Sequence, residues 1–420
     1  MKKKKTSLPN LSFHGCAVNQ REMRPPPFLL LITLAACVGW GVAAAPVQLR
    51  PPATIMDGGA PLCPGMPGSG YAIPCVTDWN GDGKKDLLVG YQPDGQIALY
   101  LNLGTDAQPC FTNFTVLKTA DGTIIKHSSS GCGAPAPWVC DFDGDGKRDL
   151  LVGAGLDGTV WFYRNTNTDT APLLAPGVQL MVGTNVLSVG IRATPYVCDW
   201  DGDGLPDLLC GAGSGYVYFF KNTNTAQAPI FASGVKIQAG GADLCLAGSL
   251  GGVGRSVVRV FDWDGDGLKD LVCSSDGGVY WCRNTNNNSN PILQAPVPIC
   301  VLATTNLVPI VTGPVPGARM RLDLVDWNND GVIDLILGNA DGTVYAYEGQ
   351  FRIGIVAQPG NNVALQWNSM PHLSYNVLTS DCVISVHNLA VANLPSGGTC
   401  TGWTNQMQDR PQFFRVELAP

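Results

Sequence analysis

Glutamate, histidine and charged residues in general are scarce in this sequence of 420 residues. Only three of its 33 acidic residues are glutamate (Glu22, Glu348 and Glu417), which leaves 30 aspartates, and there are four histidines. Glutamate and lysine favour helices whereas aspartate favours turns, so this balance argues against a helical bundle, a coiled coil or a doubly wound α/β enzyme. Charged residues make up 14% of the chain and the net charge is -7. The sequence therefore lacks the basic face expected of a nucleic-acid-binding protein.

Turn-forming and hydrophobic residues are plentiful. The chain has 51 glycines and 31 prolines, and 45% of its residues are hydrophobic. Enough apolar surface is available for a large core, so wholesale disorder is not expected. Together these features predict an all-β protein.

The first 45 residues form an export segment in this interpretation. Basic residues precede an apolar run from Phe28 to Val42, which ends in three alanines. This pattern is typical of a secretory signal, and the run is too short for a membrane span. The segment around Cys37 also resembles a lipoprotein box, so a lipid anchor at Cys37 remains an alternative to ordinary cleavage. We expect a secreted or cell-surface protein with no transmembrane span in the mature chain.

A nine-residue pattern recurs five times between residues 46 and 350. It has Asp at positions 1, 5 and 9, Asp or Asn at position 3, and Gly at position 6. The copies begin at Asp78, Asp141, Asp199, Asp262 and Asp326, with intervals of 63, 58, 63 and 64 residues. Each is followed by an apolar run, a tight turn that is usually Asp-Gly, and an aromatic segment, and an Asp-Gly turn between apolar segments predicts a hairpin.

Each repeat therefore predicts four antiparallel strands, and four-stranded units repeated around a ring make a β-propeller. The fifth repeat stops at Glu348-Gly349, after its third strand. The segment Pro46-Val-Gln-Leu49 resembles the fourth strand Gly177-Val-Gln-Leu180, so we expect it to complete the last blade. This predicts five blades; the alternative of seven would need two further repeats.

The five Asp loops and the Asn-Thr-Asn turns that follow three of them resemble the FG-GAP or VCBS repeat family, which is related to the integrin α-chain propeller. The resemblance covers roughly residues 46 to 350. It implies a calcium-binding propeller of a secreted or cell-surface protein, acting in adhesion or ligand binding. Integrin-type propellers have seven blades, which is why that number remains the alternative.

The Asp loops are candidate calcium sites, because hard cations prefer several oxygen ligands and alternate loop residues can point at one centre. The expected ligands are the side chains at positions 1, 3, 5 and 9 and the carbonyl at position 7. They are Asp78, Asn80, Asp82, Lys84 and Asp86; Asp141, Asp143, Asp145, Lys147 and Asp149; Asp199, Asp201, Asp203, Leu205 and Asp207; Asp262, Asp264, Asp266, Leu268 and Asp270; and Asp326, Asn328, Asp330, Val332 and Asp334.

About five structural Ca²⁺ ions follow from this pattern. Position 12, which is acidic in an EF-hand, holds Val89 in the first copy, so the sites join two strands and not two helices. Without metal the clustered carboxylates would repel each other, although turns capped by aspartate alone are the alternative. Residues 46 to 420 carry 20 basic and 32 acidic residues, and the resulting -12 would fall to -2 with five Ca²⁺.

Three arginines are candidate ligand-binding residues. Arg192, Arg255 and Arg319 each stand seven residues before the first loop Asp of their repeats. In a four-stranded blade the calcium loops share one face and the connections between blades share the other. If the first strands line the channel, these arginines converge near its mouth and could hold a carboxylate or sulfate. The alternative is an ion pair between blades or a backbone clamp.

The remaining features concern cysteines and the C-terminal segment. Cys210 and Cys273 replace valines of sister repeats and predict small buried side chains, whereas loop cysteines such as Cys110 could form disulfides in an exported protein. Residues 351–420 lose the repeat and predict a small β-sandwich-like domain with strands at 363–367, 375–378 and 413–418.

A non-catalytic binding or adhesion module for an extracellular protein or polysaccharide ligand is the favoured function. The alternative is a five-bladed carbohydrate-active enzyme, a glycosidase or lyase. A glycosidase normally needs a carboxylate pair with a Glu as acid. Only Glu348 and Glu417 lie beyond residue 45, and 18 of the 30 aspartates belong to the Asp loops. His127 is the one histidine between residues 46 and 350, so a Ser-His-Asp site is also poorly supplied.

Overall fold

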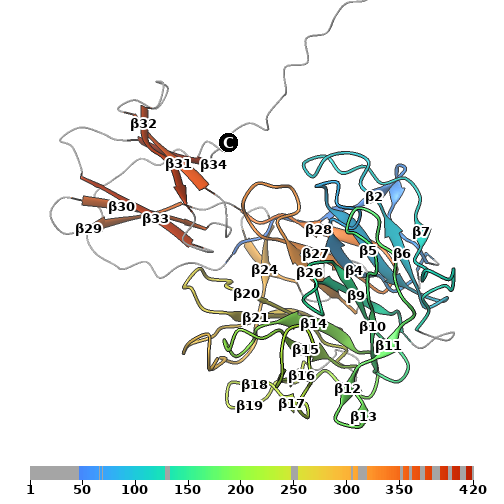
Figure 1. Ribbon diagram of the computed structural model, residues 1–420. Helices are drawn as coiled ribbons and strands as arrows, with labels where there is room; N and C mark the ends of the chain where they lie inside the picture. Colours follow the sequence, from blue (N-terminus) through green and yellow to red (C-terminus); the bar gives the residue numbers. More distant parts are fainter. Residues whose placement is uncertain are drawn as a thin grey trace, which may run out of the picture.

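The computed structural model describes residues 47–350 apart from 66, 69, 128–132, 247–253, 304–305 and 311–318, and beyond them the strands between 353 and 418. Five four-stranded antiparallel sheets are arranged around a ring (Figure 1). The predicted all-β, five-bladed propeller is confirmed, and the seven-bladed alternative is wrong. No helix able to span a membrane occurs among the described residues.

In blades 1 to 4 the four strands follow one another in chain order from the inside of the ring outwards. Blade 1 comprises β4 (Ile73–Thr77), β5 (Asp86–Tyr91), β6 (Gln96–Tyr100) and β7 (Thr115–Val116). Blade 2 comprises β8 (Ala136–Cys140), β9 (Asp149–Gly153), β10 (Val160–Tyr163) and β11 (Val178–Gln179). Blade 3 comprises β14 (Thr194–Cys198), β15 (Asp207–Gly211), β16 (Val217–Phe220) and β17 (Val235–Lys236). Blade 4 comprises β20 (Val257–Phe261), β21 (Asp270–Ser275), β22 (Gly278–Cys282) and β23 (Val297–Pro298).

Blade 5 is closed by the N-terminal segment. Strands β26 (Arg321–Val325), β27 (Asp334–Gly338) and β28 (Val344–Tyr347) are joined by β1 (Ala53–Thr54). Ala53 pairs with Ala346 in antiparallel register, and the Ile55 amide donates to the Val344 carbonyl at 3.0 Å. Closure by an N-terminal strand is therefore observed.

The predicted register of that closing strand is wrong by six residues. Leu49 is not equivalent to Leu180. It forms a backbone bridge to Gly349 in blade 5, and the equivalent bridge in blade 3 joins Phe231 to Asn222, at the turn before the fourth strand. Ile55 takes the place of Leu180, since Leu180 donates to the Val160 carbonyl just as Ile55 donates to that of Val344. Leu49 and Ile55 are both buried apolar residues, so hydrophobicity alone does not show which of them follows the closing strand. The pairing of β1 with β28 does.

Short two-stranded hairpins lie in four of the five connections between blades, and the described part of the connection from blade 1 to blade 2 has an isolated bridge between Lys118 and Ile124 instead. The hairpins are β2 (Met56–Asp57) with β3 (Ala60–Pro61), β12 (Met181–Val182) with β13 (Asn185–Val186), β18 (Gln238–Ala239) with β19 (Ala242–Asp243), and β24 (Cys300–Ala303) with β25 (Asn306–Pro309). Each follows a fourth strand and forms a parallel bridge to the next blade, as Val182 does with Phe231 and Asp57 with Phe111. The described hairpins thus connect neighbouring blades through backbone bridges.

The core lies between blades. The second strands are buried along their whole length, and the aromatics at loop position 2 (Trp79, Phe142, Trp200, Trp263 and Trp327) are 2% to 7% exposed. Trp263 packs with Leu49 and Ile333 of the following blade, so this ring contributes to packing between blades. Cys210 and Cys273 are fully buried among such side chains, and the described cysteines form no disulfide with one another.

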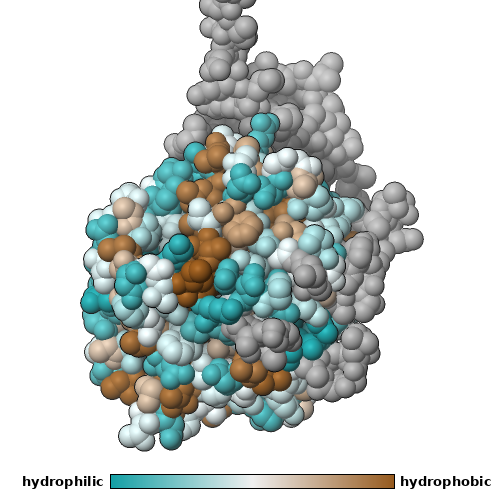
Figure 2. All heavy atoms as spheres, turned by 90° about the vertical axis from the view of Figure 1, so that its right-hand side faces the viewer, coloured by the Kyte–Doolittle hydropathy of each residue, from teal (hydrophilic) through white to brown (hydrophobic). Residues whose placement is uncertain are grey.

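The outer surface carries hydrophobic residues at equivalent positions of the blades. The outermost strands expose Val178, Val235 and Val297 at 47% to 57%. On the face in Figure 2, hydrophobic residues form separate groups among hydrophilic ones.

Residues 353–418 form two three-stranded sheets. One contains β29 (Ile353–Gln358), β30 (Asn362–Asn368) and β33 (Cys400–Gln406), and the other β31 (Ser374–Ser380), β32 (Asn388–Pro395) and β34 (Phe413–Leu418). The three predicted strands coincide with β30, β31 and β34. Residues 1–45, with the expected export segment and Cys37, lie outside the described residues.

Candidate metal centres and a channel pocket

Each Asp loop connects the first and second strands of a blade, and the same hydrogen bonds recur in all five. The position-1 carboxylate accepts from the position-6 amide, as in Gly83 to Asp78 at 3.0 Å and Gly267 to Asp262 at 2.7 Å. The position-6 glycines have φ between 82° and 87°, a left-handed conformation that glycine adopts without strain. The position-5 carboxylate accepts from the position-7 amide, for example Leu268 to Asp266 at 2.9 Å. The loop therefore wraps around its own acidic side chains.

The position-9 aspartates join the loop to the turn between strands 3 and 4. All five are fully buried. Asp270 accepts from the Trp263 amide at 3.0 Å, from the Asn284 amide at 2.7 Å and from Trp281 Nε1 at 2.8 Å. Burial raises the pKa of these carboxyls, to about 7 for Asp270 and about 8 for Asp334. A buried carboxylate held by backbone donors has a structural role here whether or not a cation is bound.

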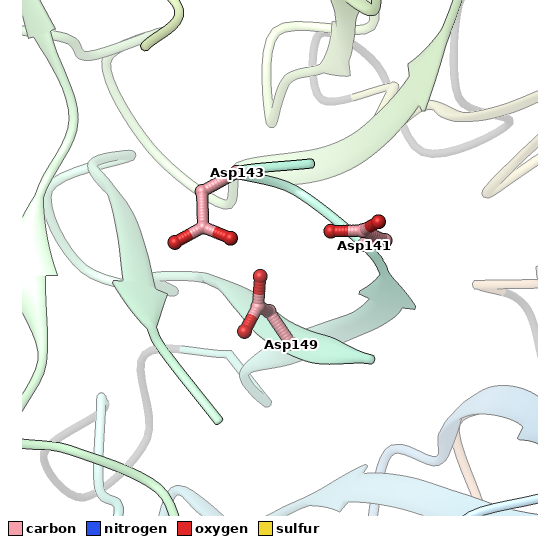
Figure 3. Close-up of side chains that lie close together, drawn as sticks. All are labelled: Asp141, Asp143 and Asp149. Carbon is pink, nitrogen blue, oxygen red and sulfur yellow. The ribbon is translucent and has the colours of Figure 1, made fainter. Parts of the chain in front are cut away.

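Three of the loops bring carboxylate oxygens to a common centre. Asp141, Asp143 and Asp149 point toward one another (Figure 3), and one oxygen from each lies within 4.8 Å of the others. The same holds for Asp199, Asp201 and Asp203, and for Asp262, Asp264 and Asp270. Three carboxylate oxygens gathered this closely can ligate a single hard cation such as Ca²⁺.

Buried oxygens without a partner support a cation at these centres. The Oδ1 atoms of the position-3 residues Asp143, Asp201 and Asp264 are buried, and no hydrogen bond to them is found among the described residues. Asp264 is only 4% exposed. A buried carboxylate oxygen without a partner lowers the stability of the fold. A bound cation would be a suitable partner for each of these oxygens. The residues present therefore fit Ca²⁺.

The first and fifth loops are built differently. Position 3 is Asn80 or Asn328, whose Oδ1 accepts from the position-5 amide at 3.1 Å or 2.9 Å. Asp78, Asp82 and Asp86 complete the first loop, and Asp326, Asp330 and Asp334 complete the fifth. The expected carbonyl ligands Lys84, Lys147, Leu205, Leu268 and Val332 occupy position 7, where their amides bond position 5.

A basic side chain from the end of the third strand contacts position 3 in the middle loops, which sequence reasoning missed. Arg164 Nε lies 2.6 Å from Asp143 Oδ2, Arg283 Nε lies 2.6 Å from Asp264 Oδ2, and Lys221 pairs with Asp201. The equivalent residues are Leu101 and Glu348 in the blades with Asn at position 3. A basic residue at the end of the third strand thus occurs only in the repeats that have Asp at position 3. This correlation between the two positions is visible in the sequence.

We predict that Arg283→Leu, which copies the Leu101 arrangement, raises the calcium affinity of the fourth loop about tenfold, because a positive charge beside the ion is removed. In chelator the same change lowers the free energy of unfolding by up to about 1 kcal/mol, since Arg283 is partly exposed and solvent screens the pair. Calcium titration by calorimetry and urea unfolding measure the two effects.

Lys236→Leu is the matched control, because Lys236 pairs with Asp243 on an outer hairpin at 3.2 Å. Calcium affinity should not change in this variant. A weaker calcium site in Arg283→Leu would instead show that the guanidinium is needed to position Asp264.

Neighbouring loops are also connected to one another. Arg148 at position 8 of the second loop lies 3.9 Å from Asp78 of the first, and Lys269 lies 4.0 Å from Asp199. Lys85 contacts Asn329 of the fifth loop. These contacts join the loops of adjacent blades on one face of the ring.

The three candidate arginines of the sequence line a single pocket. Arg192, Arg255 and Arg319 lie two residues before β14, β20 and β26, and Arg321 begins β26. Consecutive first strands contact one another around the ring, so these strands form its inner wall. Sequence reasoning missed Arg321, which follows Arg319 by two residues, and the buried Asp276 that it contacts at 3.5 Å.

The fold and these loops define a five-bladed β-propeller with an acidic loop in every blade. The chain contains FG-GAP-like repeats, which a family model matches at residues 141–210 and 262–337.

Curated relatives include integrin α chains. Integrin alpha-4 of Xenopus laevis is 27% identical over 158 residues, covering 34% of this chain and 14% of that protein. Integrin alpha-PS2 of Drosophila melanogaster is 29% identical over 180 residues, covering 37% of this chain and 12% of that protein. The matches thus span less than a sixth of these relatives' length.

Solved structures to which the chain shows some similarity include an exo-beta-1,3-galactanase from Phanerochaete chrysosporium with galactose. It has a TM-score of 0.40 and 9% identity, covering 88% of this chain and 96% of that one. BBS1N in complex with ARL6DN has a TM-score of 0.34 and 12% identity, covering 76% of this chain and 94% of that one.

Proposed function

We propose that this protein is an extracellular, calcium-binding β-propeller that acts as a non-catalytic binding module for a protein or polysaccharide ligand. Residues 1–45 direct its export in this proposal, residues 46–350 form the propeller, and residues 351–420 form an accessory β domain. The observation that carries it is the set of convergent Asp loops, in which buried position-3 oxygens lack a partner.

Calcium has a structural role in this proposal. Each ion would be held by side chains at positions 1, 3, 5 and 9 and by the position-7 carbonyl, and it would supply the positive charge that the loop carboxylates lack. The loops recur once per blade at the junction of the first two strands. An ion in each loop would therefore stabilise the connection between the two inner strands of its blade. Integrin α chains among the relatives support an extracellular binding role.

The test combines calcium titration with ligand screening. Calorimetry on the chelated, desalted chain should give about five calcium sites. A glycan array and an array of extracellular proteins, each probed with calcium and with chelator, should show calcium-dependent binding. Mass spectrometry of the bound glycans should find no cleavage products; released product would establish the enzyme instead, and absence of calcium binding would refute the proposal.

A further inference from the structure

The pocket at the inner wall of the propeller has a strongly positive lining. Its cavity volume is about 40 Å³, which is room for a group of a few heavy atoms. Four arginines line it, Arg192, Arg255, Arg319 and Arg321, and no acidic residue is among the described lining residues. The concentration of guanidinium groups in one concave place distinguishes this pocket from an ordinary basic surface.

The backbone at the pocket is held in an unfavourable conformation. Arg192, Arg255 and Arg319 have φ of 52°, 47° and 80°, and Tyr71 at the equivalent place in blade 1 has 47°. Side-chain-bearing residues rarely adopt this region, because it strains the backbone. The arginine amides are nevertheless fixed, since Arg192 donates to Gly155 and Arg255 to Gly213, both at 3.2 Å. The strained backbone thus presents large side chains where glycine would fit more easily.

One buried carboxylate accompanies the four arginines. Asp276 is fully buried, pairs with Arg255, and lies 3.5 Å from Arg321 Nη2. Arg321 is 7% exposed, and burial, together with its arginine neighbours, lowers its pKa to about 10. Arg319 stacks on Tyr71 of the next blade at 4.6 Å. Contacts between blades therefore explain part of the cluster. Among the described residues, one carboxylate faces four guanidinium groups, which leaves an excess of positive charge there.

The channel beside the pocket is filled by the next layer of inward-facing residues. Trp138 and Tyr196 rings lie 4.7 Å apart, and the Arg259 guanidinium lies over both. Arg259 is paired with Asp323 at 2.7 Å, and both are buried. Because side chains two residues apart on a strand share a face, this layer lies directly behind Thr194 and Arg321. A ligand would therefore enter from one side only.

We propose that this pocket binds the carboxylate or sulfate group of an acidic sugar. Guanidinium forks match both oxyanions with paired hydrogen bonds. Gln92 in the lining has a side-chain amide of the kind that bonds sugar hydroxyls, whereas the Thr194 hydroxyl is already bonded to the Ser256 carbonyl. The inference rests on the proposed role as a non-catalytic binding module and specifies its ligand class.

The test uses the calcium-loaded full chain and calorimetric titration with glucuronic acid, glucose 6-sulfate, glucose, acetate and inorganic sulfate. The acidic sugars should bind, glucose should not, and added NaCl should weaken binding. Arg192→Gln and Arg319→Gln should each lower the affinity at least tenfold. Arg319→Lys, which keeps the charge but loses the fork, should bind weakly while remaining folded. Lys236→Gln is the matched control, since Lys236 lies over the Tyr216 ring at 3.6 Å on an outer strand.

The possible outcomes separate this inference from the proposed function. Equal affinity for acetate, sulfate and acidic sugars, or binding only of an aspartate-containing peptide added as a further probe, would overturn the assignment to a sugar. Unchanged affinity for the acidic sugars in both Arg192→Gln and Arg319→Gln would show that this pocket is not the binding site. Calcium stoichiometry and a search for cleavage products on the same samples test the proposed function independently, so the pocket can fail while the calcium-binding module stands.

Discussion

In chelator, the Asp270→Ala protein is expected to lose about 3 kcal/mol or more of its unfolding free energy relative to the parent chain. The substitution removes the acceptor for the Trp263 amide, the Asn284 amide and Trp281 Nε1. Each buried donor left without a partner costs about 1 to 3 kcal/mol. Urea unfolding in chelator measures this effect without any contribution from bound calcium.

Two further variants make this result specific. Asp270→Asn retains one acceptor oxygen and should lose less stability, which provides a measurement if the alanine variant does not fold. Asp243→Ala removes a partly exposed aspartate of an outer hairpin and should change stability by less than about 0.5 kcal/mol. If Asp270→Ala were no less stable than Asp243→Ala, the position-9 carboxylates would not join the loops to the strand 3–4 turns.

Withdrawal of calcium is expected to lower the melting temperature strongly. A site filled at a hundred times its dissociation constant contributes about 2.7 kcal/mol, so even two such sites contribute more than about 5 kcal/mol. Bound calcium would also offset repulsion among the carboxylates and would supply a partner for the Asp264 Oδ1 atom. Calorimetric melting with calcium and with excess chelator measures the change.

Magnesium and one loop variant are the controls for this experiment. Magnesium should restore little stability, because it requires shorter, octahedral coordination. Asp264→Asn should reduce the calcium-dependent gain by the contribution of one site and leave the rest. An identical melting temperature in calcium and in excess chelator would contradict a structural role for the ions.

The fold and the Asp loops were predictable because their signals are local. The spacing within nine residues determines which side chains face the loop centre, and the tight turns determine the hairpins. The seven-residue spacing also indicated one place for Arg192, Arg255 and Arg319, which the structure finds at one pocket.

Features that depend on distant partners were harder to predict. The resemblance to other fourth strands predicts the closing strand at residues 46–49, whereas residues 53 and 54 pair with β28, and this pairing depends on a partner far along the chain. Arg283, which follows the third strand of blade 4, contacts Asp264 in the loop between the first two strands. Asp276 of blade 4 contacts Arg321 of blade 5. Such contacts depend on how strands pair and blades pack, which the spacing of residues does not specify.

Ring closure by β1 also bears on the order in which the chain can fold during synthesis. Arg50 and Glu348, which pair at 2.8 Å, are 298 positions apart. The residues around β1 leave the ribosome long before the third strand of blade 5, so their hydrogen-bonding edge stays without its native partner while the other blades form. The closing contact is therefore among the last to be made, and a chain stopped before Val344 would keep an open ring with an unpaired N-terminal strand.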